Sequence, residues 1–202
     1  MVGFDQLIAK SLNDTIREQL GSKTIKKIED RIFEKFGISF VQSIEEFEKL
    51  DIVLREFFGK GADGIEKNIF ANVFQTKSQK SKSNWYTIKD PQISSTILQA
   101  FGDPEKKKIL EFLTDESKII ADIIKNCDLP QTSGYRKINS LIDDGLLMSA
   151  EQVIKENKKV NKYISVISNV KINIEKSNVI IELQLNEQQE QNSSVVQVIQ
   201  QL

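Results

Sequence analysis

The chain has 202 residues, of which 39% are hydrophobic and 28% are charged, and its formal net charge is −1. This composition is ordinary for a globular protein, and no apolar run approaches the roughly 18 residues that a membrane span requires. With no histidine and one cysteine, Cys127, the sequence lacks an internal disulfide, a typical zinc site and a Ser-His or Cys-His catalytic pair.

These absences lead us to predict a protein that is not an enzyme, with no catalytic residues, no bound metal and no cofactor. The glycine-containing segment at 59–64 lacks the spacing of a nucleotide-binding loop. The first residues lack the basic flank and continuous apolar stretch of a secretory signal. We therefore expect a cytoplasmic location and no membrane contact.

Positive charge is grouped in three segments, although the sum is close to neutral. Residues 67–89 contain five lysines and no acid, 129–142 contain one arginine and one lysine without an acid, and 153–162 carry four lysines against one glutamate. Attraction to phosphate is the main source of non-specific affinity for nucleic acid, so these segments are candidate contacts. Residues 45–56 are, by contrast, acidic.

Residues 1–75 are predicted to form a helical domain of four helices. Apolar residues recur at steps of three and four over 4–20, 25–36, 41–57 and 65–74, and glycines follow the first three segments. Nine of the eleven phenylalanines lie here, which predicts an aromatic core. Its apolar surface serves either to pack a single copy or to support dimerisation or effector binding.

Residues 76–90 are rich in lysine, serine and glutamine, and we predict a linker. Trp85 and Tyr86 interrupt it, and they either contact nucleic acid or dock the linker onto a neighbouring domain. We favour docking.

Aspartate followed by proline marks the start of two further helices. Asp90 and Asp103 are predicted N-caps, and the proline after each fits the first helical position, where its missing N–H is no loss. The apolar pattern then predicts helices over 91–101 and 104–113.

Residues 117–147 have the pattern of a helix-turn-helix. Ser117 is predicted to cap a short first helix, which ends before a turn at 126–129. The second helix is predicted over 130–144 and ends at Gly145. Its buried stripe consists of Tyr135, Ile138, Leu141 and Ile142.

Burial of that stripe leaves a polar face without acids on the second helix. Arginine can bond a guanine edge with two hydrogen bonds, glutamine and asparagine can do the same for adenine, and serine or threonine can bond phosphate. Gly134 lets the helix approach either the preceding helix or the duplex. The predicted DNA-binding residues of this face are Gln131, Thr132, Ser133, Arg136, Lys137 and Asn139.

After Gly145 the apolar pattern changes from helical to alternating, which predicts a β-hairpin wing. Its strands are expected over 146–154 and 161–168, joined by a polar loop. The loop lysines are placed to contact a flanking phosphate or enter the minor groove. They are Lys155, Lys158 and Lys159.

The stretches ILQAFGDPEKKKILEFL and LPQTSGYRKINSLIDDGLL, with the wing after them, resemble the winged helix-turn-helix domains of ArsR-like transcriptional regulators, especially archaeal ones. The resemblance covers about 93–168. It implies that Gln131, Thr132, Ser133, Tyr135, Arg136 and Lys137 lie on the DNA-facing helix, and Lys158 and Lys159 on the wing.

The sequence departs from the metal-sensing members of that family. Those members carry paired cysteines on the first helix of the motif, or acid and histidine sites on a terminal helix, and neither is present here. We therefore expect no metal sensing, and we expect Cys127 to be a small buried residue. A redox switch through its one thiol is the alternative.

Two segments follow the wing. Residues 170–186 alternate around a Lys-Ser-Asn turn, which predicts a hairpin that either extends the wing sheet or pairs across a dimer. The glutamine-rich residues 187–202 are expected to form a flexible tail unless a partner covers their valine cluster.

The predicted fold class is mostly α with a small antiparallel β wing, in which the helical domain precedes a winged helix-turn-helix over 91–186. We predict a sequence-specific transcriptional regulator that binds double-stranded DNA as a homodimer and associates with the nucleoid. The alternative is a winged-helix module that binds a protein of the transcription machinery, with an unknown effector possible for either.

Overall fold

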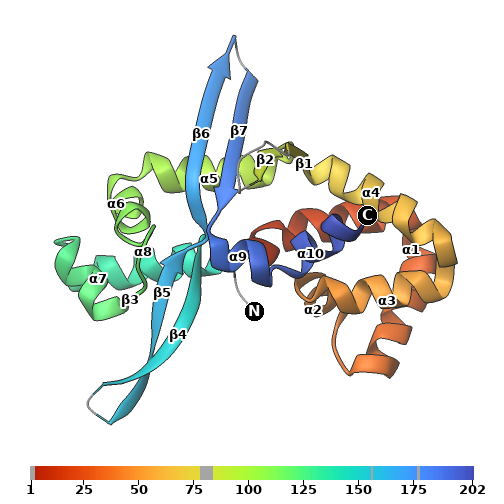
Figure 1. Cartoon of the computed structure of the whole chain (residues 1–202), viewed down its shortest axis with the longest axis horizontal. Coiled ribbons are helices and arrows are strands. Elements are labelled where there is room, and N and C mark those ends of the chain that lie inside the picture. Colours follow the sequence, from red (N-terminus) through yellow and green to blue (C-terminus); the bar gives the residue numbers. More distant parts are fainter. Residues whose placement is uncertain (1–2, 78–83, 156, 177) are drawn as a thin grey trace.

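The computed structural model describes residues 3–77, 84–155, 157–176 and 178–202. Two groups of elements lie side by side, with helices α1 to α4 and α10 in one group and α5 to α8 with β3 to β5 in the other (Figure 1). Two long hairpins, β4–β5 and β6–β7, project in opposite directions. Buried apolar side chains from both groups join in one continuous core.

The N-terminal helices follow the predicted pattern, with two changes at their boundaries. Helix α1 (Phe4–Phe36) contains both of the first two predicted segments, because the chain kinks at Gly21 (φ 71°, ψ 157°) and resumes as helix at once. The predicted helix over 41–57 is divided into two. The elements here are α2 (Phe40–Glu45), α3 (Phe47–Phe58), a 3-10 turn η1 (Gly59–Gly61) and α4 (Ala62–Val73).

The segment predicted as a linker instead contributes two strands, β1 (Phe74–Lys77) and β2 (Trp85–Ile88), which pair antiparallel. Trp85 and Tyr86 are buried, so the docking role is confirmed. The Tyr86 hydroxyl donates a hydrogen bond to Glu190 Oε2 at 2.7 Å. Most of the linker's lysine and serine residues, at 78–83, lie outside the described residues.

Helices α5 (Pro91–Gly102) and α6 (Pro104–Phe112) begin as predicted. Asp90 accepts hydrogen bonds from the N–H groups of Gln92 and Ile93, and Asp103 accepts them from the two equivalent N–H groups of α6. The predicted cap at Ser117 is wrong, because the next residues form β3 (Lys118–Ile119). The following helices are α7 (Ile120–Asn126) and α8 (Gln131–Asp143).

The remaining strands form two hairpins. The predicted wing is β4 (Leu147–Lys155) with β5 (Lys158–Ser165), and these strands reach further into the predicted loop than expected. The second predicted hairpin is β6 (Ile167–Glu175) with β7 (Asn178–Leu185). It does not extend the wing sheet, because β7 pairs with β2.

The predicted fold class is therefore wrong. The described residues contain seven strands in two antiparallel sheets, with strand orders β1-β2-β7-β6 and β3-β5-β4, rather than a small wing on a helical protein. The error lies in β1 and β2, which have only four residues each. So short an alternation carries little signal. β2 pairs with the distant β7, and β1 pairs with β2.

The predicted flexible tail is also ordered, as helices α9 (Glu187–Asn192) and α10 (Ser194–Gln201). Asp5, in the first turn of α1, accepts hydrogen bonds from the hydroxyl of Ser193 and from the N–H and hydroxyl of Ser194, the latter two at 2.8 and 2.9 Å. The valine cluster is buried against this protein's own core, so no partner is needed to cover it.

Helices α3 and α4 enclose a buried acidic residue, Glu66. No described group donates a hydrogen bond to either of its carboxylate oxygens, and the nearest cation, Arg55 Nη2, lies 3.8 Å from Oε2. Burial raises the pKa of Glu66 to about 8, and the neighbouring Asp51 adds to the rise. The folded protein therefore retains this proton at pH values where the unfolded chain has lost it.

We predict that the free energy of unfolding falls as the pH rises from about 4.5 to about 8, because the folded state binds more protons than the unfolded state in that window. The Glu66 contribution to the slope approaches about 1.4 kcal/mol per pH unit. Glu66→Gln should flatten the dependence in denaturant titrations over this range. Glu18→Gln, at an exposed position of α1, is the control, and equal slopes in the two variants would refute the prediction.

Candidate nucleic-acid interface

Helix α8 packs closely on α7 because Gly134 has no side chain. A Cβ atom at position 134 would lie 2.9 Å from Ile124 Cγ1 and 3.3 Å from Leu129 Cβ. Of the two roles considered for this glycine, close approach to the preceding helix is thus the one that the structure supports. Behind it, Ile138 and Leu141 are buried as predicted.

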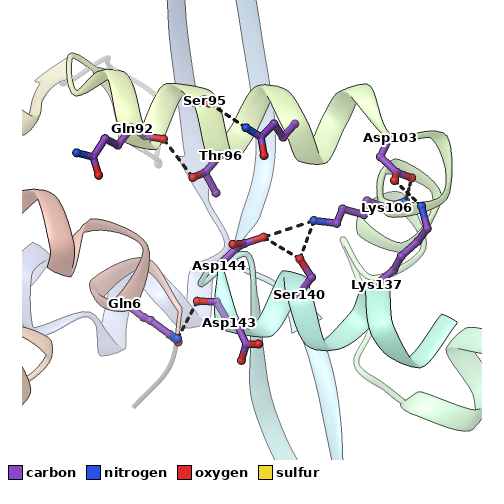
Figure 2. A network of polar contacts seen from close by, with 11 residues as sticks. Gln6, Gln92, Ser95, Thr96, Asp103, Lys106, Lys137, Ser140, Asp143 and Asp144 are labelled. Carbon is purple, nitrogen blue, oxygen red and sulfur yellow. Dashed lines mark hydrogen bonds and ion pairs between the residues drawn. The ribbon is translucent and has the colours of Figure 1, made fainter. Parts of the chain in front are cut away.

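Polar contacts attach α8 to α6 on a second side (Figure 2). Lys106 Nζ lies 2.8 Å from Ser140 Oγ and 3.5 Å from Asp144 Oδ2. Lys137 pairs with Asp103 and lies 3.1 Å from Glu105 Oε2. The hydrogen bond to Asp103, followed by Glu105, raises the pKa of Lys137, and the same bond lowers the pKa of Asp103.

Two of the predicted DNA-facing residues therefore point toward α6. The Lys137 side chain is 16% exposed and held by the two carboxylates, and Ser133 Oγ donates to Glu105 at 3.4 Å. The sequence placed Lys137 on the polar face because it lies outside the predicted buried stripe. It could not show that the capping residue Asp103 would lie opposite Lys137.

The remaining predicted residues of α8 form an exposed face without acids. The nearest acids along the chain, Asp143 and Asp144, are the last residue of α8 and its C-cap. Within the part of the chain that the structure describes, no carboxylate lies within ion-pairing distance of Arg136. Tyr135, predicted both in the buried stripe and, from the family resemblance, at the DNA, is 41% exposed. The exposed residues are Gln131, Thr132, Tyr135, Arg136 and Asn139.

The β4–β5 hairpin places three lysines near its tip. Lys155, Lys158 and Lys159 are all exposed, and the register sets Lys155 directly opposite Lys158. Like charges at such positions repel, so an anion beside them would be stabilising. A contact that the sequence did not reveal is Asp122, at the start of α7, whose Oδ1 lies 3.9 Å from Lys155 Nζ.

The C-terminal end of α8 contacts the beginning of α1. Gly145 has a φ of 71°, as its predicted capping role requires, and a Cβ there would lie 2.5 Å from the backbone nitrogen of Leu7. Gln6 Nε2 also donates to the carbonyl oxygen of Asp143 at 3.0 Å (Figure 2). The N-terminal helices and α8 are thus mechanically joined.

In the described segments, no cluster of side chains is suited to holding a metal ion, and no helix is long and apolar enough to cross a bilayer. Cys127 is buried, as predicted, and burial raises the pKa of its thiol. No family model, curated protein or solved structure matches this chain.

We predict that Gly134→Ala destabilises the protein by about 1 kcal/mol or more, because the added methyl group displaces Ile124. Gly64→Ala is the matched control, since a Cβ at that exposed position in α4 meets nothing within 4 Å. There the gain in helix propensity should stabilise the protein by roughly 0.5–1 kcal/mol. Thermal unfolding of both variants tests this, and a stabilised Gly134→Ala protein would contradict the packing described.

Proposed function

We propose that this protein is a sequence-specific regulator of transcription that binds double-stranded DNA, with α8 in the major groove and the β4–β5 hairpin on flanking phosphates. The observation that carries the proposal is the exposed, acid-free face of α8, which bears Arg136 without a described carboxylate partner. The resemblance of 93–168 to ArsR-like regulators supports the same function. Action on DNA implies a cytoplasmic, nucleoid-associated protein.

The side chains of the α8 face suit different parts of a duplex. Arg136 is proposed to bond the N7 and O6 atoms of a guanine, and Gln131 and Asn139 to bond adenine edges. Thr132 lies in the first turn, where the helix has no side-chain cap and no acid. The free N–H groups and the positive end of the helix dipole at that turn favour a phosphate.

The hairpin lysines are proposed to supply affinity rather than sequence selectivity. Lys155 and Lys158 face each other across the ladder, and Lys159, opposite Ile154, is exposed on the other face of the hairpin. A DNA phosphate between the Lys155 and Lys158 ammonium groups would remove their mutual repulsion while it released counterions from the duplex. Because the net charge of the chain is only −1, non-specific binding should depend on this local cluster.

We predict that Arg136→Ala weakens binding to the preferred sequence by about 1–3 kcal/mol and reduces the preference for guanine at one position. The preferred sequence is first obtained by selection from a randomised duplex library. Affinities are then measured by fluorescence anisotropy on that site and on its guanine substitutions. Arg17→Ala, at an exposed arginine of α1, is the control and should bind like the wild type, so equal losses in both variants would refute this role.

We predict that Lys158→Ala weakens binding to all sequences alike and lowers the slope of log affinity against log salt concentration by about 1. Lys60→Ala, at an exposed lysine of η1, should leave the slope unchanged. The measurement is a titration of a duplex at several salt concentrations. An unchanged slope for Lys158→Ala would remove the hairpin from the interface.

One observation favours a second candidate function, in which the same elements bind a protein of the transcription machinery. Ile154, near the tip of the β4–β5 hairpin, is 75% exposed, and an apolar side chain there suits a protein surface better than a phosphate. Affinity for random duplex at low salt separates the two functions, because a protein-binding module should have essentially none.

A further inference from the structure

The outer part of the β6–β7 hairpin presents an unpaired strand edge. β6 is the terminal strand in the order β1-β2-β7-β6, and β7 is its only neighbour among the described strands. Residues 171–175 are exposed and project away from the rest of the molecule (Figure 1). The unpaired N–H and C=O groups of such an edge can bond another strand.

One face of the β6–β7 hairpin also carries apolar side chains from the buried core out to the exposed tip. Ile172 pairs with the buried Ile181, and Ile174 pairs with Val179, so these four side chains share one face. Toward the tip they become exposed, with 39% of Ile172, 67% of Ile174 and 40% of Val179 accessible. An apolar face beside a free edge is typical of a site for strand addition.

We propose that the occupant of this edge is β6 of a second copy of the chain, paired antiparallel about a two-fold axis through Asn173. The segment 171–175 reads Lys-Ile-Asn-Ile-Glu. In this register Lys171 lies opposite Glu175 of the partner subunit, Ile172 lies opposite Ile174 of the partner subunit, and both pairs occur twice. The two four-stranded sheets become one continuous sheet.

Charge complementarity favours this register over two alternatives. A parallel, in-register pair sets Lys171 against the same lysine of the other copy, which is repulsive. An antiparallel pair centred on Ile174 sets Ile172 against a lysine. Asn173 Nδ2 donates to Glu175 Oε1 at 2.9 Å, which places the carboxylate on the same face as Lys171.

Pairing would require one local rearrangement. Lys171 Nζ lies 3.8 Å from the centre of the Trp85 ring, so the ammonium group must swing outward to meet the partner's carboxylate. Trp85 is the only tryptophan of the chain, and its fluorescence should therefore change as the dimer forms. Because the interface is small, we expect a dissociation constant on the order of micromolar.

The test uses two single variants whose charges are complementary. Glu175→Lys gives a strand with two lysines, and Lys171→Glu gives a strand with two glutamates. In sedimentation velocity over a concentration series, each variant alone should dimerise about tenfold or more weakly than the wild type, because both cross-strand pairs become repulsive. An equimolar mixture should recover a dimer of near wild-type affinity.

A second test changes an isoleucine near the tip of each hairpin, and the variant in the β4–β5 hairpin is the control. Ile174→Lys should abolish the dimer, whereas Ile154→Lys, at a position 75% exposed on the other hairpin, should not. Asn173→Cys should form a disulfide across the axis, since directly opposed Cα atoms in a sheet lie about 4.5–5.5 Å apart. The native Cys127 is buried and does not compete.

A wild-type chain that stays monomeric at every concentration would overturn the proposal, as would a dimer that survives both Ile174→Lys and the two charge variants. The measurements are made without DNA, and the proposal does not depend on DNA binding. A monomer that binds DNA would refute the dimer alone, and a dimer without affinity for DNA would refute the proposed function alone.

Discussion

The contacts made by the first turn of α1 hold the rest of the structure together. Phe4 packs against Phe74 of β1 and Tyr86 of β2, with ring centroids 5.7 and 5.5 Å away. The next residue, Asp5, holds the start of α10 through Ser193 and Ser194. Burial raises the pKa of Asp5, while these hydrogen bonds oppose the rise. One helical turn therefore joins the N-terminal helices, the four-stranded sheet and the C-terminal helices.

The same turn restrains the proposed DNA-reading helix. Leu7 lies so close to Gly145 that no larger residue fits there, and Gln6 donates a hydrogen bond to the carbonyl oxygen of Asp143, the last residue of α8. A rotation of α8 relative to the N-terminal helices would break these contacts. Because α1 and α8 share these contacts, a shift of α1 would also move α8, the helix proposed to bind DNA.

Local signals predicted the elements whose stability is local. The aspartate-proline pairs before α5 and α6, and the glycines after α1 and α8, identified helix ends correctly, because capping depends on neighbouring residues alone. The β1 and β2 strands and the two C-terminal helices were missed. Their formation depends on β7, Asp5 and a core assembled from distant residues, none of which a local pattern contains.

The sequence by itself determined the helices with a clear apolar periodicity, both long hairpins, the buried cysteine and the polar face of α8. These properties follow from periodicity and residue chemistry along a short stretch of chain. Only the tertiary structure decided that Arg136 stays exposed while Lys137 pairs with Asp103 and Glu105 of α6. The two residues are adjacent in the sequence and both are positively charged, so the packing of another helix against one of them makes the difference.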